Sequence, residues 1–270
     1  GADEVTKMPA MNTELLACAA FLLLAPVLCS GATTNSPVAK DKTVKVLFLG
    51  NSYTDGIQAT FRQVVSTSPY TNSVFDFRWG GGVTLDKLIR NGRAFRCIEQ
   101  EKWDYVVLQE QSLTPAILGR PRESFYQSVD TLVEKIRGIG AEPILYMTWG
   151  RRDGFEGNTV SLPDFEAMQA KLSEAYRHAA KKHGIALAPV GEAWAEVRKK
   201  DPTLGLKLYQ KDGSHPSQKG SFVATCVFLR VLFDDSLEQV ALPEGMSEQE
   251  SATIRETVSG MPMPSTHSGD

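Results

Sequence analysis

Between residues 44 and 233, short apolar runs alternate with longer segments in which apolar residues recur every three or four positions. The first pattern is typical of a buried strand and the second of a helix with one buried face. Their repeated alternation predicts a parallel sheet covered by helices on both faces. The expected strands are residues 44–49, 74–79, 105–108, 144–147 and 185–190, and the expected helices contain residues 57–65, 85–89, 125–136, 165–179 and 222–233.

The segments on either side of this block differ from it in composition. Residues 15–28 form an almost unbroken apolar run, followed by the small residues Ser30, Gly31 and Ala32. This pattern predicts a signal peptide over residues 1–32 and export to the periplasm or the extracellular space, with an uncleaved membrane anchor as the alternative. We expect a flexible leader at 33–43, one domain at 44–240, and a loose C-terminal tail at 241–270 with a short helix near 247–258.

Charge and cysteine content limit the partners and the means of stabilisation. The net charge of −3 and the isoelectric point of about 5.9 do not favour nucleic acid or an anionic membrane as a partner. A chain of 270 residues can bury a core without disulfides or a metal. Cys97 and Cys226 remain after the predicted cleavage. They either pair in an oxidising compartment or stay as buried thiols.

Ligands of parallel sheets bind at the carboxyl ends of the strands, and a serine lies at the first of these ends. Ser52 follows the first expected strand by two residues and precedes a helix. Its hydroxyl would lie near a helix N-terminus, where backbone N–H groups favour a developing negative charge. The position suits a nucleophile, although a serine there can also be a simple helix cap.

A histidine near the end of the domain strengthens the first interpretation. Of the four histidines, only His215 lies in a loop between the expected elements, and Asp212 precedes it by three residues. Such an aspartate can reach the imidazole, fix its tautomer and stabilise the imidazolium formed when it takes the serine proton. The alternative is a surface turn of the Asp-Gly type. Ser52, Asp212 and His215 together predict a catalytic triad.

Two further strand ends carry possible donors to an oxyanion. The glycines Gly80–Gly82 end the second strand and allow close approach of backbone N–H groups to a substrate. Gln109 and Gln111 end the third strand, and either can donate a side-chain N–H. Each motif also has a plain structural explanation, a turn for the glycines and a solvated polar side chain for the glutamines.

Weaker candidates for substrate contact surround these strand ends. Trp79, Trp149 and Arg151 lie at or just beyond the expected strands, although Trp149 equally suits a buried core. The loop at residues 150–163 is long enough to form a lid over the site.

The order of these motifs resembles the SGNH (GDSL-like) hydrolase superfamily over about residues 44–233. The block Leu-Gly-Asn-Ser-Tyr-Thr around Ser52, the glycine Gly82, and Asp212-x-x-His215 match its first, second and last motifs. The resemblance implies a single three-layer α/β/α domain with a five-stranded parallel sheet in flavodoxin-like order. It also implies an oxyanion hole formed by Ser52, Gly82 and a side-chain amide.

Two departures from the superfamily pattern stand out. Asn51 occupies a position where many members have Asp, and the third block reads Leu-Gln-Glu-Gln-Ser at residues 108–112 instead of Gly-x-Asn-Asp. A glutamine, either Gln111 or Gln109, would then replace the usual amide donor. This variant, with its Gly-Asn-Ser-Tyr-Thr first block, resembles a bacterial branch of the superfamily.

The resemblance implies a two-step acyl transfer that needs no metal or organic cofactor. The function that we expect is that of a secreted serine esterase acting on carboxylic esters, with O-acetyl groups on a carbohydrate as the favoured substrate. The alternatives are a lipase- or arylesterase-like hydrolase and a catalytically silent carbohydrate-binding protein. A small-molecule or glycan ester is the expected partner, without nucleic acid or an integral membrane partner, and the oligomeric state is left open.

Overall fold

The computed structural model describes residues 43–263, all of which belong to one compact unit. The predicted signal peptide and most of the leader lie outside these residues. Five parallel strands form a sheet in the order β2-β1-β3-β4-β7, which is the flavodoxin-like order and confirms the predicted fold class. The strands are β1 (Lys45–Gly50), β2 (Val74–Trp79), β3 (Tyr105–Leu108), β4 (Glu142–Tyr146) and β7 (Ala186–Ala188).

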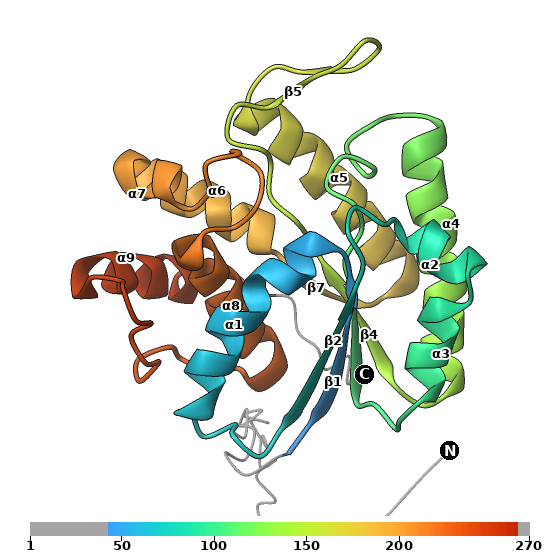
Figure 1. The fold of residues 1–270 in the computed structure, drawn as a ribbon, viewed down its shortest axis with the longest axis horizontal. Helices are drawn as coiled ribbons and strands as arrows, with labels where there is room; N and C mark the ends of the chain where they lie inside the picture. The colour runs from blue at the N-terminus through green and yellow to red at the C-terminus, as the bar shows by residue number, and fades with distance from the viewer. Residues whose placement is uncertain (1–42, 264–270) are drawn as a thin grey trace, which may run out of the picture. The chain divides into compact units, whose positions relative to one another are not determined.

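Helices cover both faces of the sheet, so the domain has three layers (Figure 1). One face is covered by α1 (Ser52–Ser66), α6 (Val190–Lys200), α8 (Gln218–Phe233) and α9 (Glu248–Ser259), with α7 (Pro202–Lys207) beside α6. The other face is covered by α2 (Leu85–Arg90), α3 (Arg93–Glu99), α4 (Arg120–Gly138) and α5 (Phe165–His183). Among the described helices, none combines the length and apolarity needed to cross a bilayer.

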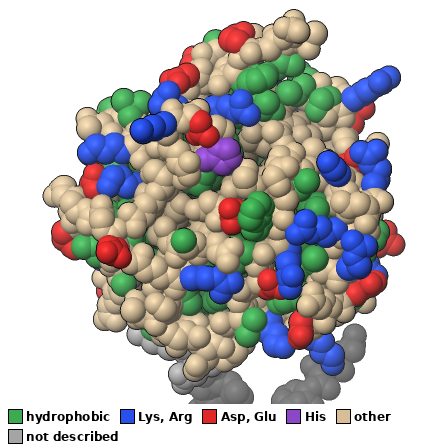
Figure 2. All heavy atoms as spheres, in the orientation of Figure 1, with side chains coloured by type: hydrophobic (Ala, Val, Ile, Leu, Met, Phe, Trp, Pro, Cys, Tyr) green, Lys and Arg blue, Asp and Glu red, His purple; other side chains and the backbone are tan. Residues whose placement is uncertain are grey.

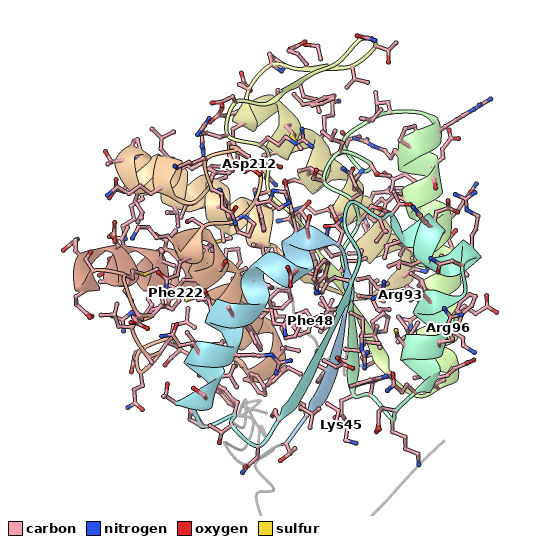
Figure 3. The ribbon with its side chains drawn as sticks, in the orientation of Figure 1. Lys45, Phe48, Arg93, Arg96, Asp212 and Phe222 are labelled. Atoms are coloured by element: carbon pink, nitrogen blue, oxygen red, sulfur yellow. The ribbon has the colours of Figure 1, made fainter. Side chains whose placement is uncertain are left out.

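The central strands are apolar at nearly every position because each of their faces meets a helical layer. On β1, Phe48 stacks on Phe77 at 4.4 Å between ring centroids and meets Phe228 of α8 edge to face at 5.0 Å. Its neighbours Leu47 and Leu49 point to the opposite cluster, as the alternation of side chains along a strand requires. Figure 3 shows Phe48 and Phe222 on the side of α1 and α8, and Arg93 and Arg96 on α3 across the sheet.

The two cysteines of the described residues lie in different layers. Cys97 of α3 belongs to the cluster under α2–α5, and Cys226 of α8 belongs to the cluster under α1, α6 and α9. Both are buried free thiols. Of the two possibilities that the sequence left open, the structure therefore shows the unpaired one.

Several short elements were not expected from the sequence. They are α3, α6, α7 and a two-stranded hairpin, β5 (Phe155–Glu156) with β6 (Ser161–Leu162), which lies within the predicted lid loop. The last strand ends at Ala188 and not at residue 190, because Pro189 and Val190 begin α6.

A loose tail was predicted for residues 241–270, but the part of it that the structure describes, up to residue 263, contains a packed helix. The short helix is present as α9, but Ile254 and Val258 are completely buried in the cluster that contains α8 and α6. Composition indicated a polar, mobile segment because the apolar residues are few. Ile254 and Val258 lie on one face of α9 and pack against the domain.

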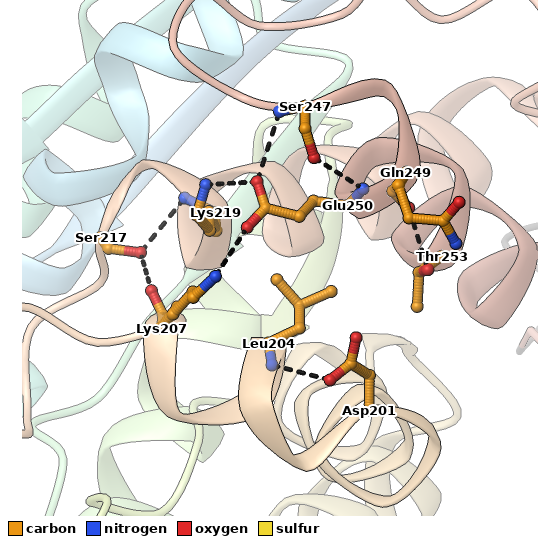
Figure 4. Close-up of polar contacts among 9 residues, drawn as sticks. All are labelled: Asp201, Leu204, Lys207, Ser217, Lys219, Ser247, Gln249, Glu250 and Thr253. Carbon is orange, nitrogen blue, oxygen red and sulfur yellow. Dashed lines mark hydrogen bonds and ion pairs between the residues drawn. The ribbon is translucent and has the colours of Figure 1, made fainter.

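A network of ion pairs joins the start of α9 to α7 and α8 (Figure 4). The carboxylate of Glu250 accepts from Lys219 Nζ at 2.6 Å and from Lys207 Nζ at 3.3 Å. The same residue forms a capping box with Ser247, the N-cap of α9. Glu250 therefore stabilises the helix itself and its docking to the domain.

Candidate active site

Ser52 is the first residue of α1 and lies at the carboxyl end of β1. The N-cap is Asn51, whose Oδ1 accepts from the Tyr53 backbone N–H at 3.0 Å, so Ser52 is not the helix cap. The backbone N–H groups in the first turn of a helix lack intrahelical acceptors. The half-buried Ser52 side chain therefore lies where a developing negative charge is stabilised.

The fold brings the three predicted triad residues together although 163 positions separate Ser52 from His215. Ser52 Oγ lies 2.9 Å from His215 Nε2, and His215 Nδ1 lies 2.5 Å from Asp212 Oδ2. Asp212 Oδ1 also accepts from the backbone N–H groups of Ser214 and His215, at 2.9 and 3.0 Å. The turn around Asp212 and its contact with the His215 ring coexist, because each uses a different oxygen of one carboxylate.

The charge of Asp212 determines which ring nitrogen of His215 carries a proton. Partial burial raises the pKa of the Asp212 carboxyl. Hydrogen bonds from the His215 ring and from two backbone N–H groups outweigh this effect and hold the pKa below its ordinary value. An ionised carboxylate can only accept, so His215 Nδ1 is the donor and Nε2 is left to accept from the Ser52 hydroxyl.

The triad lies at an exposed edge of the domain. The side chains of His215 and Asp212 are 37% and 47% exposed. Figure 2 shows a histidine side chain beside an acidic one on the face where Figure 3 labels Asp212. A separate cavity of about 1140 Å³ between α5, α6 and the end of α9 contains no predicted site residue. We place the candidate active site at the exposed edge, because the cavity between α5, α6 and α9 lacks a paired nucleophile and base.

An aromatic stack supports the loop that carries His215. The Tyr53 ring stacks on Trp149 at 4.6 Å, and Trp149 stacks on Trp194 at 4.1 Å. Tyr53 also meets the His215 ring edge to face at 5.5 Å. Ser214 is held twice, since its Oγ lies 2.7 Å from Tyr53 Oη and its carbonyl accepts from Trp149 Nε1 at 3.0 Å.

This stack corrects one prediction about substrate contact. Trp149 is completely buried and engaged on both ring faces, so it does not reach a substrate. It belongs to the core, which was the alternative prediction for this residue. Sequence reasoning assigned no role to the Tyr53 and Ser214 side chains, because their contacts join segments 161 residues apart.

Trp79 and Arg151 are accessible at the same edge of the sheet. Trp79 ends β2, directly before Gly80, and is 38% exposed. Arg151 follows β4 and is half-buried, with its guanidinium 5.2 Å from the Phe155 ring centroid and its Nη2 3.4 Å from Ser112 Oγ. Both remain predictions for substrate contact.

The structure distinguishes the two glutamines proposed as oxyanion donors. Gln109 is buried, its Oε1 accepts from Asn51 N and Thr54 Oγ1 at 2.9 Å, and its Nε2 donates to the Glu110 carbonyl. With both amide atoms engaged inside the domain, Gln109 is not available as a donor, which corrects that alternative.

Gln111 is the better candidate of the two. Its Oε1 accepts from the backbone N–H groups of Leu113 and Thr114, at 2.8 and 3.3 Å, which fixes the orientation of the amide. The Nε2 group makes only a long contact of 3.4 Å with Ser112 Oγ among the described residues. Its N–H groups are therefore free to bind another acceptor.

The glycine of the second block has a backbone that few other residues would adopt. Gly82 has φ of +60°, and a Cβ there would meet no atom within 4 Å, so the left-handed conformation and not crowding favours glycine. Within the described part of the chain, no acceptor for its N–H is found.

Asn51 Nδ2 donates to the adjacent Val83 carbonyl at 3.2 Å. An aspartate could not make this bond, which gives the Asn51 departure a physical reason.

Across residues 43–263, no group of three or more His, Cys, Asp or Glu side chains is arranged to hold a metal ion.

Comparison with known proteins identifies the family through solved structures. No protein-family model and no curated protein matches the chain. A protein from Slackia heliotrinireducens assigned to the SGNH hydrolases shares 30% identity over 69% of this chain and 97% of its own length, with a TM-score of 0.56. A DUF4886 family protein from Bacteroides uniformis shares 19% identity over 81% of this chain and 94% of its own, with a TM-score of 0.62.

An acetylxylan esterase from Geobacillus stearothermophilus has the same fold at lower similarity. It shares 18% identity over 71% of this chain and 95% of its own length, with a TM-score of 0.54. The flavodoxin-like sheet with a serine, a histidine and an aspartate at its carboxyl edge is the architecture of a hydrolase. Given the extent of the match to the Slackia protein, the chain belongs to the SGNH hydrolases.

Proposed function

We propose that the chain is a serine esterase that hydrolyses carboxylic esters, with Ser52 as nucleophile, His215 as general base and Asp212 as its orienting acid. The observation that carries this proposal is the continuous pair of contacts from Ser52 Oγ through the His215 ring to the Asp212 carboxylate, at 2.9 and 2.5 Å. A base within hydrogen-bond reach of the nucleophile and held by a third group is the arrangement that such catalysis requires.

Acylation begins when His215 Nε2 takes the hydroxyl proton of Ser52 and Oγ bonds to the ester carbonyl carbon. The backbone N–H groups of Ser52 and Gly82 and the amide of Gln111 are proposed to bind the oxyanion. As the tetrahedral intermediate collapses, the bond to the alkoxy oxygen breaks. His215 returns its proton to that oxygen, and the alcohol leaves.

Deacylation repeats the same steps with water. His215 takes a proton from the water molecule as its oxygen bonds to the acyl carbon. Collapse of the second intermediate breaks the bond to Ser52 Oγ, which receives the proton from His215. A carboxylic acid is released, and the side chains return to their starting protonation states.

We further propose that the substrate is a carbohydrate that carries O-acetyl groups. The likeness in fold to the acetylxylan esterase of Geobacillus stearothermophilus supports this choice. The exposed Trp79 beside Gly80–Gly82 offers an aromatic face for a sugar ring. The apolar run at residues 15–28 supports export, and the Gly-Asn-Ser-Tyr-Thr block supports a place in the bacterial branch that it resembles.

The proposal is tested by measuring hydrolysis of p-nitrophenyl acetate by the wild type and by Ser52→Ala and His215→Ala. Each substitution is expected to lower kcat by about a thousandfold or more, because the nucleophile or its base is lost. Acetate release from acetylated xylan and other acetylated polysaccharides then tests the substrate.

A second histidine–aspartate pair supplies a matched control. His183 Nε2 lies 2.7 Å from Asp130 Oδ1, at the end of α5 that leads into β7 and hence at the edge opposite Ser52. His183→Ala should keep the wild-type rate. Equal turnover by the wild type and Ser52→Ala would refute the triad, and a clear preference for long-chain esters would favour a lipase-like enzyme instead.

A further inference from the structure

One buried carboxylate has no part in the acyl transfer described above. Glu110 lies directly after β3 and is only 1% exposed. Its Oε1 accepts from the Gln111 backbone N–H at 2.6 Å and from the Leu85 N–H at 3.2 Å, and its Oε2 lies 3.3 Å from the same Leu85 nitrogen. A buried carboxylate is costly unless its hydrogen bonds offset the loss of water, so its presence needs a reason.

The two N–H groups belong to the two loops that carry the proposed oxyanion donors. Leu85 is the first residue of α2 and ends the loop that contains Gly82. Gln111 itself supplies the side-chain amide. Glu110 therefore joins the loop after β2 to the loop after β3 through one side chain.

The neighbouring contacts attach the Ser52 segment to the same loops. Asn51 N donates to Gln109 Oε1 at 2.9 Å, and Asn51 Nδ2 donates to the Val83 carbonyl at 3.2 Å. These bonds hold the start of α1 to each loop separately. Glu110 adds the direct link between the loops, so the three strand ends form a closed set of hydrogen bonds.

We infer that Glu110 is a positioning residue that sets the Gly82 N–H and the Gln111 amide at a fixed separation around the oxyanion. The inference rests on the proposed esterase function. When Glu110 is ionised, its hydrogen bonds are roughly twice as strong as neutral ones, which suits a group that must hold two loops in register.

Substitutions at Glu110 should change kcat more than KM. In Glu110→Ala both N–H groups lose their acceptor, and a displacement of the donors by about 1 Å is expected to lower kcat by about 100-fold. KM should stay within about twofold, because the oxyanion donors act on the transition state more than on the bound ester. Glu110→Gln should retain at least about a fifth of the wild-type kcat, since Oε1 alone already accepts from both N–H groups.

The experiment measures kcat and KM for p-nitrophenyl acetate and the inhibition constant of phenylboronic acid, which adds to a serine to form a tetrahedral anion. For Glu110→Ala the inhibition constant should rise roughly in proportion to the fall in kcat, since both depend on the same donors. Glu101→Gln is the matched control. It removes a carboxylate that pairs with Lys45 at the start of β1 and makes no contact with the loops after β2 and β3.

The outcomes separate this inference from the esterase proposal. An inactive wild-type protein would remove both. An active wild type with Glu110→Ala at an unchanged kcat, or with a lowered kcat and unchanged boronate inhibition, would overturn the inference alone. If Glu110→Ala fails to fold, Glu110→Asp replaces it: the shorter side chain withdraws the oxygens, so its kcat must fall below that of Glu110→Gln for the inference to hold.

Discussion

Gly56 of α1 lies so close to Pro216 that a Cβ at residue 56 would be 2.7 Å from the Cγ atom of the proline ring and 3.0 Å from its Cδ. Gly56 is about one helical turn beyond Ser52, and Pro216 directly follows His215. This contact therefore sets how closely the loop with the proposed base approaches the helix with the proposed nucleophile.

Gly56→Ala should separate activity from stability. The added methyl must push Pro216 and its loop away, and a shift of about 1 Å between Ser52 and His215 is expected to lower kcat by 10- to 100-fold. The gain in helix propensity of up to about 1 kcal/mol should offset part of the strain in the folded state. Ester hydrolysis and urea unfolding of the same preparation measure the two effects.

Gly138→Ala is the control for this comparison. Gly138 ends α4, and a Cβ there meets no atom within 4 Å. The substitution should leave kcat unchanged and the unfolding free energy equal or slightly higher. A Gly56→Ala variant with wild-type kcat would show that the contact does not set the catalytic distance.

Trp149→Phe is expected to destabilise the protein and to impair catalysis through the loop of His215. The smaller ring leaves a cavity between Tyr53 and Trp194 and removes the donor to the Ser214 carbonyl. We expect the unfolding free energy to fall by about 2 kcal/mol or more. Denaturant unfolding checks the stability, and kcat for p-nitrophenyl acetate checks the loop.

Trp79→Ala should behave in the opposite way. This exposed side chain is a candidate for sugar contact, so its loss should raise KM for an acetylated oligosaccharide but not for p-nitrophenyl acetate, with little change in stability. Equal effects of the two substitutions on KM for the oligosaccharide would argue against a buried, purely structural role for Trp149.

The stability of the protein should depend on pH through Glu110. Burial raises the pKa of this carboxyl to about 7, with a smaller upward contribution from Asp86 and an opposing one from its two N–H donors. Tyr176 also faces this group, with its hydroxyl 3.3 Å from the Glu110 N–H. Between about pH 4.5 and 7 the folded state then binds more protons than the unfolded state, so the unfolding free energy falls as pH rises, by up to about 3 kcal/mol.

Glu110→Gln removes this titration and isolates it from other groups. Urea unfolding at pH 5 and pH 8 should show a stability difference in the wild type that is smaller in the variant by about 2 to 3 kcal/mol. Identical pH dependence in the two proteins would mean that Glu110 is ionised throughout this range.

Glu250 should contribute stability with the opposite pH dependence. Its hydrogen bond from Lys219 is the main cause that lowers its pKa to about 2, with further support from Ser247 and Lys207. Because its pKa is depressed in the folded state, ionised Glu250 stabilises the fold above about pH 4.5. This stabilisation is lost as pH falls toward 2. Because water screens the lysines, we expect Glu250→Gln to cost about 1 to 2 kcal/mol at pH 7 and less at pH 3.

Glu248→Gln provides the comparison for Glu250→Gln. Glu248 lies in the same first turn of α9 and pairs with Arg255, but its side chain is 71% exposed. This substitution should change the unfolding free energy by less than about 0.5 kcal/mol. Equal losses from the two variants would contradict the view that Glu250 docks α9 onto the domain.

The sheet was predictable because each central strand is short, apolar on both faces and followed by a helical stripe. β2 and β3 were predicted with their observed bounds. The helix α6 was missed although Val190, Ala193, Trp194 and Val197 have helical spacing, because its start had been assigned to the preceding strand. The strands β5 and β6 have two residues each, too few to produce a periodic pattern.

The site was predictable only as far as local sequence indicates it. Ser52, Asp212 and His215 lie in short motifs whose order along the chain is informative. The stacking of Trp149 and the bonds that Gln109 Oε1 accepts involve residues 45 to 96 positions away, so no local pattern reveals them. The partner of Glu110, Leu85, lies 25 residues before it on another loop.

The central sheet stands between the Cys97 and Cys226 sulfur atoms, each of them enclosed by its own hydrophobic cluster. An oxidant would have to open both clusters before it could join these two thiols. The hydrolase domain is therefore expected to reach the same native fold in a reducing cytosol, in an oxidising periplasm, or in a refolding buffer with or without dithiothreitol.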